Sequence, residues 1–185
     1  MKVLIDTNVF LTYLTRRCDK YSTEVDVIVQ MCIDQQLEGF AAFHSLSIIW
    51  YLMRHSSLEE GLNAIKLICT SFKIAHSDND SILQALQNTG FSDFEDNLQD
   101  CCAQDVNADY IVTANVKDYE GHSSVPAVTP AEFLRRLGDS AAYNVDVPDN
   151  EVREDCALYG LQTHAPHRHY IARHHLICQH CMLVA

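Results

Sequence analysis

Basic residues are scarce in this sequence. Its 185 residues include 13 Lys and Arg against 25 Asp and Glu, which gives a formal net charge of −12. A protein that holds nucleic acid by neutralising many phosphates is normally basic, so this composition argues against that mode of binding. Any nucleic-acid chemistry must therefore depend on local basic groups or on metal ions. An acidic surface equally suits the docking of a basic protein partner.

Long apolar runs are also missing. No stretch approaches the roughly 18 apolar residues that a membrane span requires. The N-terminus has no basic region followed by a long apolar segment, so it does not resemble a secretion signal. We therefore expect a cytoplasmic protein without membrane association.

The eight cysteines are expected to be reduced, because without an export signal disulfides are disfavoured. Five of them mostly fall within helical patterns among apolar neighbours, where Cys behaves as a small buried hydrophobe. These are Cys18, Cys32, Cys69, Cys101 and Cys102.

Short apolar runs alternate with helical patterns over residues 1–138. The apolar runs predict strands at residues 2–5, 39–43, 72–75, 109–113 and 125–128. Apolar residues at helical spacing predict helices at residues 24–36, 46–53, 58–72, 80–87 and 94–107, and Thr129-Pro130 begins a last one. Trp50 and Tyr51 are expected to be core residues rather than a platform for base stacking. The alternation predicts an α/β domain with a mainly parallel sheet covered by helices.

This alternation fails after residue 138, so we expect a domain at residues 1–138 and an irregular tail at residues 139–185. Six of the ten histidines fall in the last 22 residues, beside a CxxC pair formed by Cys178 and Cys181. A zinc site needs four N or S ligands, and one CxxC with scattered histidines is a weak signal for it. Disorder, loose packing and zinc binding therefore all stay open for the tail.

Polar side chains interrupt the apolar start of the chain. Asp6, Thr7 and Asn8 follow the first predicted strand, and apolar residues resume at once. Each of these residue types can cap a helix, but a cap needs only one of the three. Ligands of a parallel α/β sheet lie beyond the carboxyl ends of its strands, which is where Asp6 falls. The cluster therefore indicates a functional site.

A second acidic group begins the helix predicted at residue 94. Ser92 or Asp93 is placed to cap it, and Glu95 and Asp96 lie in its first turn. Acids there stabilise the helix dipole by about 0.3–1 kcal/mol each, which is the simplest explanation of the group. Asp96 and Asp100, however, share one helix face, where like charges repel.

The repulsion would grow if this helix start adjoined Asp6, because crowded carboxylates are costly unless a cation or protons neutralise them. Hard oxygen ligands without Cys or His nearby favour Mg²⁺ or Mn²⁺. Such an ion can polarise a phosphodiester, activate water and stabilise the leaving oxygen. A phosphodiesterase follows as a hypothesis.

Four segments carry a family resemblance: residues 4–10 (LIDTNVF), 93–99 (DFEDNLQ), 109–119 (DYIVTANVKDY) and 126–134 (PAVTPAEFL). In this order and at these separations they resemble the PIN-domain family, in particular the ribonuclease toxins of bacterial toxin–antitoxin pairs. The resemblance covers residues 1–137 and implies a three-layer α/β/α fold with a mainly parallel central sheet. It also implies a ribonuclease that hydrolyses RNA with water and one or two Mg²⁺ or Mn²⁺ ions in an acidic pocket.

The resemblance also implies roles for individual residues. Asp6 and Asp96 match the family's metal-binding acids, and Asn115 and Asp93 complete the predicted catalytic set. Residues that would support them are Thr7, Asn8, Thr113, Glu95 and Asp118. An ordinary loop role for Asp118 is an equal alternative.

One departure from the family is serious. Members usually carry a further acid, commonly Glu, on the helix after the second strand. Residues 44–52 (HSLSIIWYL) contain no carboxylate, and Ile48 occupies the approximate position of that acid. Either Asp93 or Glu95 substitutes from across the pocket, or the site binds one ion weakly, or the domain is a degenerate module that binds RNA or protein without catalysis.

Partners follow from the same resemblance. Toxins of this family are usually neutralised by a small antitoxin whose segment enters the acidic pocket, so we expect a basic antitoxin and a homodimer. Arg16, Arg17 and Lys20 follow the short helix after the first strand, where they could meet RNA phosphates. Solvated surface is the simpler role for these three residues.

Overall fold

The structure is a computed structural model that describes residues 1–139. The predicted tail and its Cys178–Cys181 pair lie outside the described residues. Residues 1–139 form the following elements in chain order: β1 (Lys2–Ile5), α1 (Thr7–Thr15), α2 (Ser22–Ile33), β2 (Glu38–Ala42), α3 (Phe43–Leu52), η1 (Met53–His55), α4 (Leu58–Ser71), β3 (Lys73–Ala75), α5 (Asn79–Gln87), α6 (Phe94–Asp105), β4 (Tyr110–Val112), η2 (Val116–Asp118), β5 (Ala127–Val128) and α7 (Pro130–Asp139). Within this range, no helix is both long and apolar enough to cross a membrane.

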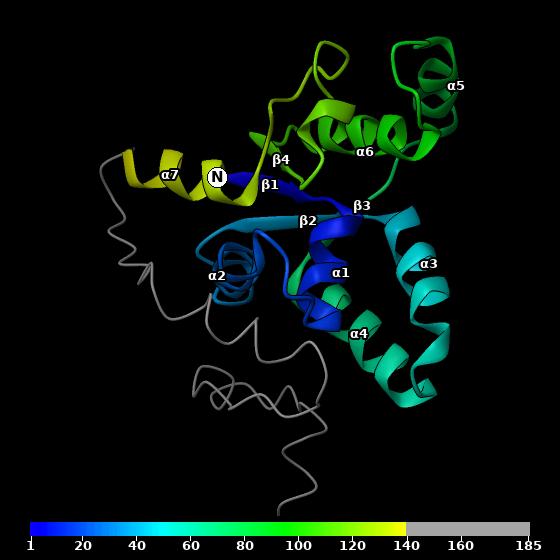
Figure 1. The fold of residues 1–185 in the computed structure, drawn as a ribbon. Coiled ribbons are helices and arrows are strands. Elements are labelled where there is room, and N and C mark those ends of the chain that lie inside the picture. The colour runs from blue at the N-terminus through cyan, green and yellow to red at the C-terminus, as the bar shows by residue number, and fades with distance from the viewer. Residues whose placement is uncertain (140–185) are drawn as a thin grey trace, which may run out of the picture. The chain divides into compact units, whose positions relative to one another are not determined.

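The five strands form one parallel sheet in the order β3-β2-β1-β4-β5 (Figure 1). β1 is central, and Leu4 pairs with Phe40 of β2 on one side and with Ile111 of β4 on the other. The outer pairs are parallel as well, so the predicted α/β architecture is confirmed. Because the strands are parallel, their carboxyl ends lie at one edge of the sheet.

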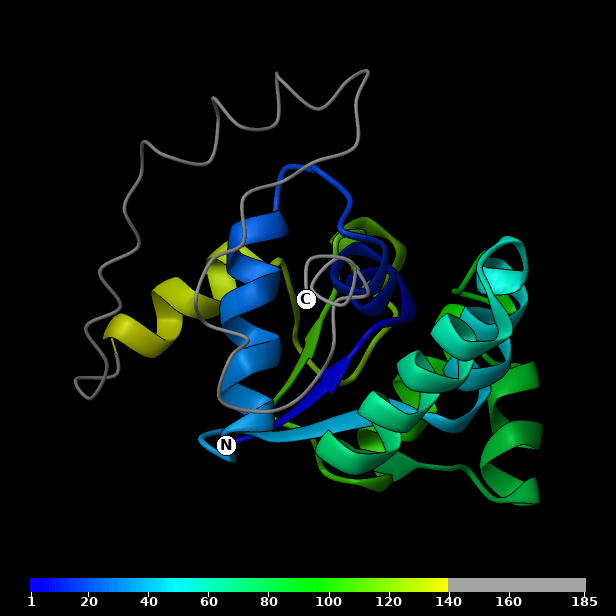
Figure 2. The ribbon, with the colours of Figure 1, turned by 90° about the horizontal axis from the view of Figure 1, so that it is seen from below.

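Alternate residues of β1 pack into two separate apolar cores. Val3 and Ile5 belong to the core that also takes residues from α1, α2 and α7, whereas Leu4 belongs to the core beneath α6. Figure 1 shows α1 and α2 on one side of the sheet and α6 on the other, and Figure 2 shows α2 in front of the strands. A strand buried on both faces has a continuous apolar sequence, which is the signal that predicted β1.

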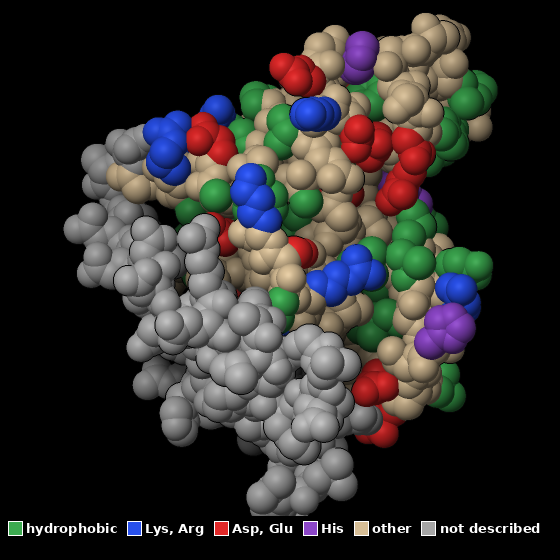
Figure 3. Space-filling view, viewed as in Figure 1, with side chains coloured by type: hydrophobic (Ala, Val, Ile, Leu, Met, Phe, Trp, Pro, Cys, Tyr) green, Lys and Arg blue, Asp and Glu red, His purple; other side chains and the backbone are tan. Residues whose placement is uncertain are grey.

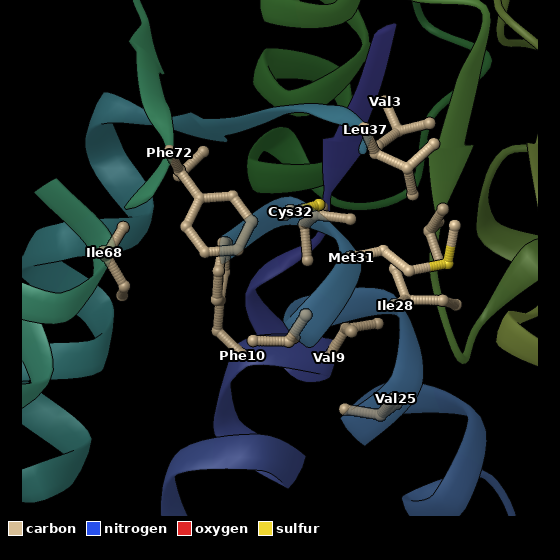
Figure 4. Packing of buried hydrophobic residues seen from close by; sticks show 14 of the residues in the cluster. Val3, Val9, Phe10, Val25, Ile28, Met31, Cys32, Leu37, Ile68 and Phe72 are labelled. Atoms are coloured by element: carbon tan, nitrogen blue, oxygen red, sulfur yellow. The ribbon is translucent and has the colours of Figure 1, made fainter. Parts of the chain in front are cut away.

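The larger core is built around Phe10 of α1. Its ring meets the Phe72 ring edge-on, with 4.9 Å between the centroids (Figure 4). Cys32 of α2 and Phe72 both press against Gly39 of β2. A Cβ atom at Gly39 would lie 2.7 Å from the Phe72 ring and 2.8 Å from Cys32 Sγ, so this close approach requires glycine.

The prediction that Trp50 and Tyr51 are core residues is wrong. They are 44% and 61% exposed, whereas their neighbour Ile49 is fully buried. The Trp50 ring instead covers Gly61 of α4, where a Cβ atom would lie 3.0 Å from the indole. Aromatic character in the sequence did not reveal which side of α3 faces the sheet.

The prediction for the cysteines holds in part. Cys32 and Cys102 are buried, but Cys18 and Cys69 are exposed. Cys101 has intermediate exposure. Being surrounded by apolar residues in the sequence was therefore not sufficient to bury a cysteine.

We expect Gly39→Ala to destabilise the domain by about 1–3 kcal/mol, because the added methyl group overpacks a core formed by Phe72 and Cys32. Gly61→Ala is the matched control, since its new methyl group meets only the half-exposed Trp50 ring and alanine favours a helix. Urea unfolding of both variants measures the difference. Equal stability of the two variants would show that the Gly39 contact is not tight.

Candidate functional site

The candidate site lies where β1 and β4 end at the same edge of the sheet. The Asp6 N–H donates to Val112 O at 3.0 Å, which extends the pairing of β1 with β4 by one residue. Thr113 follows β4 directly. A hydrogen bond from Thr7 to Glu95 brings the first turn of α6 to the same edge. Segments nearly 100 residues apart in the chain therefore meet here.

Asp6 is a buried carboxylate with three side-chain donors. Its Oδ2 accepts from Thr113 Oγ1 at 2.6 Å and from Asn8 Nδ2 at 2.7 Å. Its Oδ1 accepts from Gln99 Nε2 at 3.3 Å. Asp6 occupies the N-cap position of α1, yet its side chain makes no capping hydrogen bond, so helix capping does not explain this carboxylate.

The pKa values of two carboxyl groups of the site are raised towards neutral pH. Burial raises the pKa of Asp6 to about 7; the Thr113 hydrogen bond lowers it, and the charges of Asp96 and Glu95 raise it further. Burial and then neighbouring acids, Asp118 first, raise the pKa of Asp96 to about 6. A cation placed between these groups would favour their charged forms and relieve the repulsion.

Thr7 and Asn8 connect the end of β1 to three other segments. Thr7 Oγ1 donates to Glu95 Oε1 of α6 at 2.8 Å and lies 2.9 Å from Ser45 Oγ of α3. Asn8 Oδ1 accepts from the Ala114 N–H, just beyond β4, at 3.1 Å. These contacts are consistent with the predicted role of Thr7 and Asn8, which is to support the acids of the site.

The acids at the start of α6 have different roles. Asp93 caps the helix by accepting the Glu95 N–H at 2.8 Å, so the capping explanation holds for Asp93. Glu95 is instead held by Thr7, which lies across the site. Asp96 is half-buried, and its carboxylate interacts with Asp118.

Three residues of the site were not singled out as functional from the sequence. Gln99 and Ser45 are fully buried, with Gln99 Nε2 2.9 Å from Ser45 Oγ. Tyr119 is 2% exposed, and burial and then the negative charge of Asp6 raise the pKa of its hydroxyl. Gln99 follows Asp96 by three positions and so shares its helix face, which was a usable signal. No local pattern marks Ser45 or Tyr119.

Asp100 belongs to a different polar cluster. Its carboxylate is 2% exposed and accepts from Ser123 Oγ at 2.5 Å and from Gln104 Nε2 at 2.7 Å. Burial raises the pKa of Asp100, and these hydrogen bonds lower it. Asp118, rather than Asp100, is the acid that most raises the pKa of Asp96. The helix-face repulsion expected from the sequence is therefore not what defines the site.

The remaining predicted residues lie at the margin of the site. Asp118 of η2 is half-buried near Asp96. Asn115 is exposed; its N–H donates to Thr113 Oγ1 at 3.0 Å, and its side chain forms no hydrogen bond within residues 1–139. Figure 3 shows Asp and Glu side chains gathered over α6, above a hollow in this face of the molecule.

The predicted RNA-contact residues lie beyond the far end of α1. Arg16 follows the last residue of this helix, which at 1.5 Å per residue is about 15 Å from Asp6. Arg16 forms an exposed ion pair with Asp26 at 3.4 Å. Arg17 and Lys20 are exposed. These residues are separated from the carboxylates by the length of a helix.

The donor set suits an oxygen-liganded ion only if other ligands complete its shell. Within residues 1–139, no three His, Cys, Asp or Glu side chains are placed to hold a metal ion. Asp6 and Asp96 nevertheless offer carboxylate oxygens whose charges are uncompensated. Mg²⁺ is commonly held by one or two carboxylates, with water and substrate phosphates as further ligands. The two carboxylates match that donor chemistry.

Residues 2–117 match the family model of the PIN domain. The matched segment contains Asp6, Asp96 and Asn115 and covers more than half of the chain. The chain therefore belongs to the PIN-domain family, as the resemblance of its motifs predicted. No curated protein matches the chain.

Solved structures with this fold include VapBC-1 from nontypeable Haemophilus influenzae, with a TM-score of 0.54 and 18% identity, covering 71% of this chain and 99% of that one. VapBC2 from Rickettsia felis, bound to a DNA fragment from their promoter, gives a TM-score of 0.53 and 14% identity, covering 70% and 98%. The structure of FitAB bound to an IR36 DNA fragment has a TM-score of 0.54 and 13% identity. This match covers 69% of this chain and 94% of that chain. At such identities the likeness establishes the fold alone.

The metal-free domain is expected to lose stability as the pH rises from about 4 to 7. Asp6 and Asp96 have pKa values raised from 3.8 to about 7 and about 6, so in this range the folded chain binds more protons than the unfolded chain. Asp96→Asn should flatten this slope and raise the unfolding temperature at pH 7.5 by a few degrees, at about 2–4 °C per kcal/mol.

Thermal unfolding in EDTA across this pH range measures the effect. Asp105→Asn is the matched control, because Asp105 lies on the same helix but is exposed. The control should keep the wild-type slope. A wild-type stability that climbs between pH 4 and 7 would contradict the assigned crowding of the carboxylates.

Proposed function

We propose that this protein is a metal-dependent ribonuclease that hydrolyses RNA phosphodiester bonds, and that it serves as the toxin of a toxin–antitoxin pair. The observation that carries the proposal is the buried Asp6 carboxylate, oriented by Thr113 and Asn8 and crowded by Asp96 and Glu95. Membership of the PIN-domain family supports nuclease chemistry at this position.

In this proposal Asp6 and Asp96 hold Mg²⁺ or Mn²⁺. When bound, such an ion polarises the phosphodiester, activates water and stabilises the leaving oxygen. Thr113 and Asn8 fix the orientation of the Asp6 oxygens, which is the role of residues behind a metal ligand. Asn115, exposed beside the site, has a free amide for contact with the substrate.

The missing acid on α3 is the main argument for a rival function. The α3 residue that contacts the site is Ser45, one turn before Ile48, and its hydroxyl is neutral. A degenerate domain that binds RNA or protein would keep this architecture without catalysis. The contact of Glu95 with Thr7 favours an active site, because it places a carboxylate from α6 on the network that includes Ser45. Asp93 is less suited to substitute, since it caps the helix.

Purified protein with Mn²⁺ should cleave structured RNA, and EDTA should stop the cleavage. Asp6→Asn should reduce the rate by roughly 100-fold or more, because it removes a charge that acts in a buried site. Cleavage is followed on labelled RNA by gel. Asp105→Asn, an exposed substitution on α6, is the control and should retain the wild-type rate.

The outcomes separate the two functions. Cleavage that persists in EDTA, or that Asp6→Asn leaves unchanged, would reject the proposed chemistry. Binding of RNA without cleavage, in the presence of Mn²⁺, would favour the degenerate module.

A small basic antitoxin is the proposed protein partner. The chain has a net charge of −12, and acidic side chains gather on the face that carries the site (Figure 3). Opposite charges across an interface speed association and exclude wrong partners. The antitoxin and a homodimer are proposed from the family resemblance, and Arg16, Arg17 and Lys20 are the proposed contacts for RNA phosphates.

If a small basic reading frame adjoins this gene, its product should co-purify with the protein and inhibit RNA cleavage. The complex should weaken as salt rises from 0.1 to 1 M, because the Debye length falls from about 10 to about 3 Å. Gel filtration and the cleavage assay measure both effects. An adjacent product that binds but leaves cleavage unchanged would argue against neutralisation at the acidic site.

A further inference from the structure

A buried hydroxyl without a hydrogen-bond partner lies next to the acidic site. Tyr119 is 2% exposed, and its hydroxyl makes no hydrogen bond of normal geometry with any described residue. Nearly all buried polar atoms in folded proteins are paired, so each unpaired one asks for a physical reason. The hydroxyl could have been omitted at no cost to packing, because phenylalanine has the same ring.

The groups around this hydroxyl indicate which acceptor it is placed to bind. It lies close enough to the Asp96 carboxylate to lower the pKa of that acid, while the charge of Asp6 also acts on it. A tyrosine hydroxyl donates one hydrogen bond, and a carboxylate is the strongest neutral-pH acceptor among side chains. The hydroxyl is therefore a buried donor beside the Asp96 carboxylate that forms no hydrogen bond of normal geometry with it.

The segment that carries Tyr119 is held in place from two sides. The Tyr119 carbonyl accepts the N–H groups of His122 at 3.2 Å and Ser123 at 3.0 Å. Ser123 Oγ in turn donates to the buried Asp100 carboxylate at 2.5 Å, which ties the segment to α6. The Tyr119 ring meets the Phe91 ring edge-on, with 6.0 Å between the centroids. The backbone and the ring are therefore fixed without any help from the hydroxyl.

We propose that Tyr119 is a positioning residue, whose hydroxyl donates to the Asp96 carboxylate when that group carries a cation and so fixes its orientation. This inference rests on the proposed function, because it assigns Tyr119 to the same metal site. Groups that orient a metal ligand from behind typically contribute roughly 10–100-fold to metal affinity. The polar cluster of Asp100 and Ser123 acquires a role as well, since it holds the tyrosine against α6.

A purely structural hydroxyl would behave differently when removed. Loss of a hydroxyl that stabilises the fold lowers the unfolding temperature. Loss of an unpaired buried hydroxyl leaves that temperature unchanged or raises it, because the desolvated group is no longer buried. The positioning role therefore predicts opposite signs for two measurements: metal affinity falls while metal-free stability holds or rises.

The test compares Tyr119→Phe with the wild-type chain in Mn²⁺ titration calorimetry and in thermal unfolding with EDTA. We expect Mn²⁺ affinity to fall by roughly 10–100-fold and the metal-free unfolding temperature to stay equal or rise. Tyr110→Phe is the matched control, because Tyr110 packs against Phe133 of α7, away from the acidic site. The control should leave Mn²⁺ affinity unchanged.

Each outcome has one meaning. A wild-type chain that binds no Mn²⁺ would overturn the proposed function, and the positioning role with it. A wild-type chain that binds Mn²⁺, together with a Tyr119→Phe variant of equal affinity, would overturn the positioning role alone. A variant that loses both affinity and metal-free stability would assign the hydroxyl to the fold.

Discussion

A carboxylate buried at the end of the central strand is the constraint on which the rest of the site depends. Asp6 is 3% exposed and lies among other acids, so its charged form is costly in the folded chain. Its donors come from segments that follow β1, from the end of β4 and from α6. The fold brings these segments together around a charge that hydrophobic packing alone would exclude.

Two buried polar atoms without a partner belong to residues that interact with Asp6. Among the described residues, the buried side-chain atoms without a partner are His44 Nε2, Gln99 Oε1 and Tyr119 Oη. Gln99 contacts Asp6 directly, and Tyr119 lies beside Asp96. Polar groups left unpaired at one edge of a sheet indicate a site whose remaining contacts come from ligands.

The periodicity of apolar residues and the positions of the predicted strand ends were sufficient to predict much of this architecture from the sequence. The apolar run before Asp6 predicted β1, and the parallel sheet then placed Asp6 and Thr113 at one edge. Contacts that depend on how distant elements face each other leave no pattern in the local sequence, so they could not be predicted from it. For that reason the contacts of Ser45 and Tyr119 in the site were not predicted. The exposure of Trp50 and the hydrogen bond between Asp100 and Ser123 were not predicted either.

The most direct test of the central claim is the number of protons released when Mn²⁺ binds, measured by calorimetry in buffers of different ionisation enthalpy. Metal ligands must be deprotonated, so binding to carboxyl groups with pKa values of about 7 and about 6 displaces protons. We expect release of about one proton per ion near pH 6.5 and almost none near pH 9. Binding without any pH-dependent release would contradict it, because the ion would then lie away from Asp6 and Asp96.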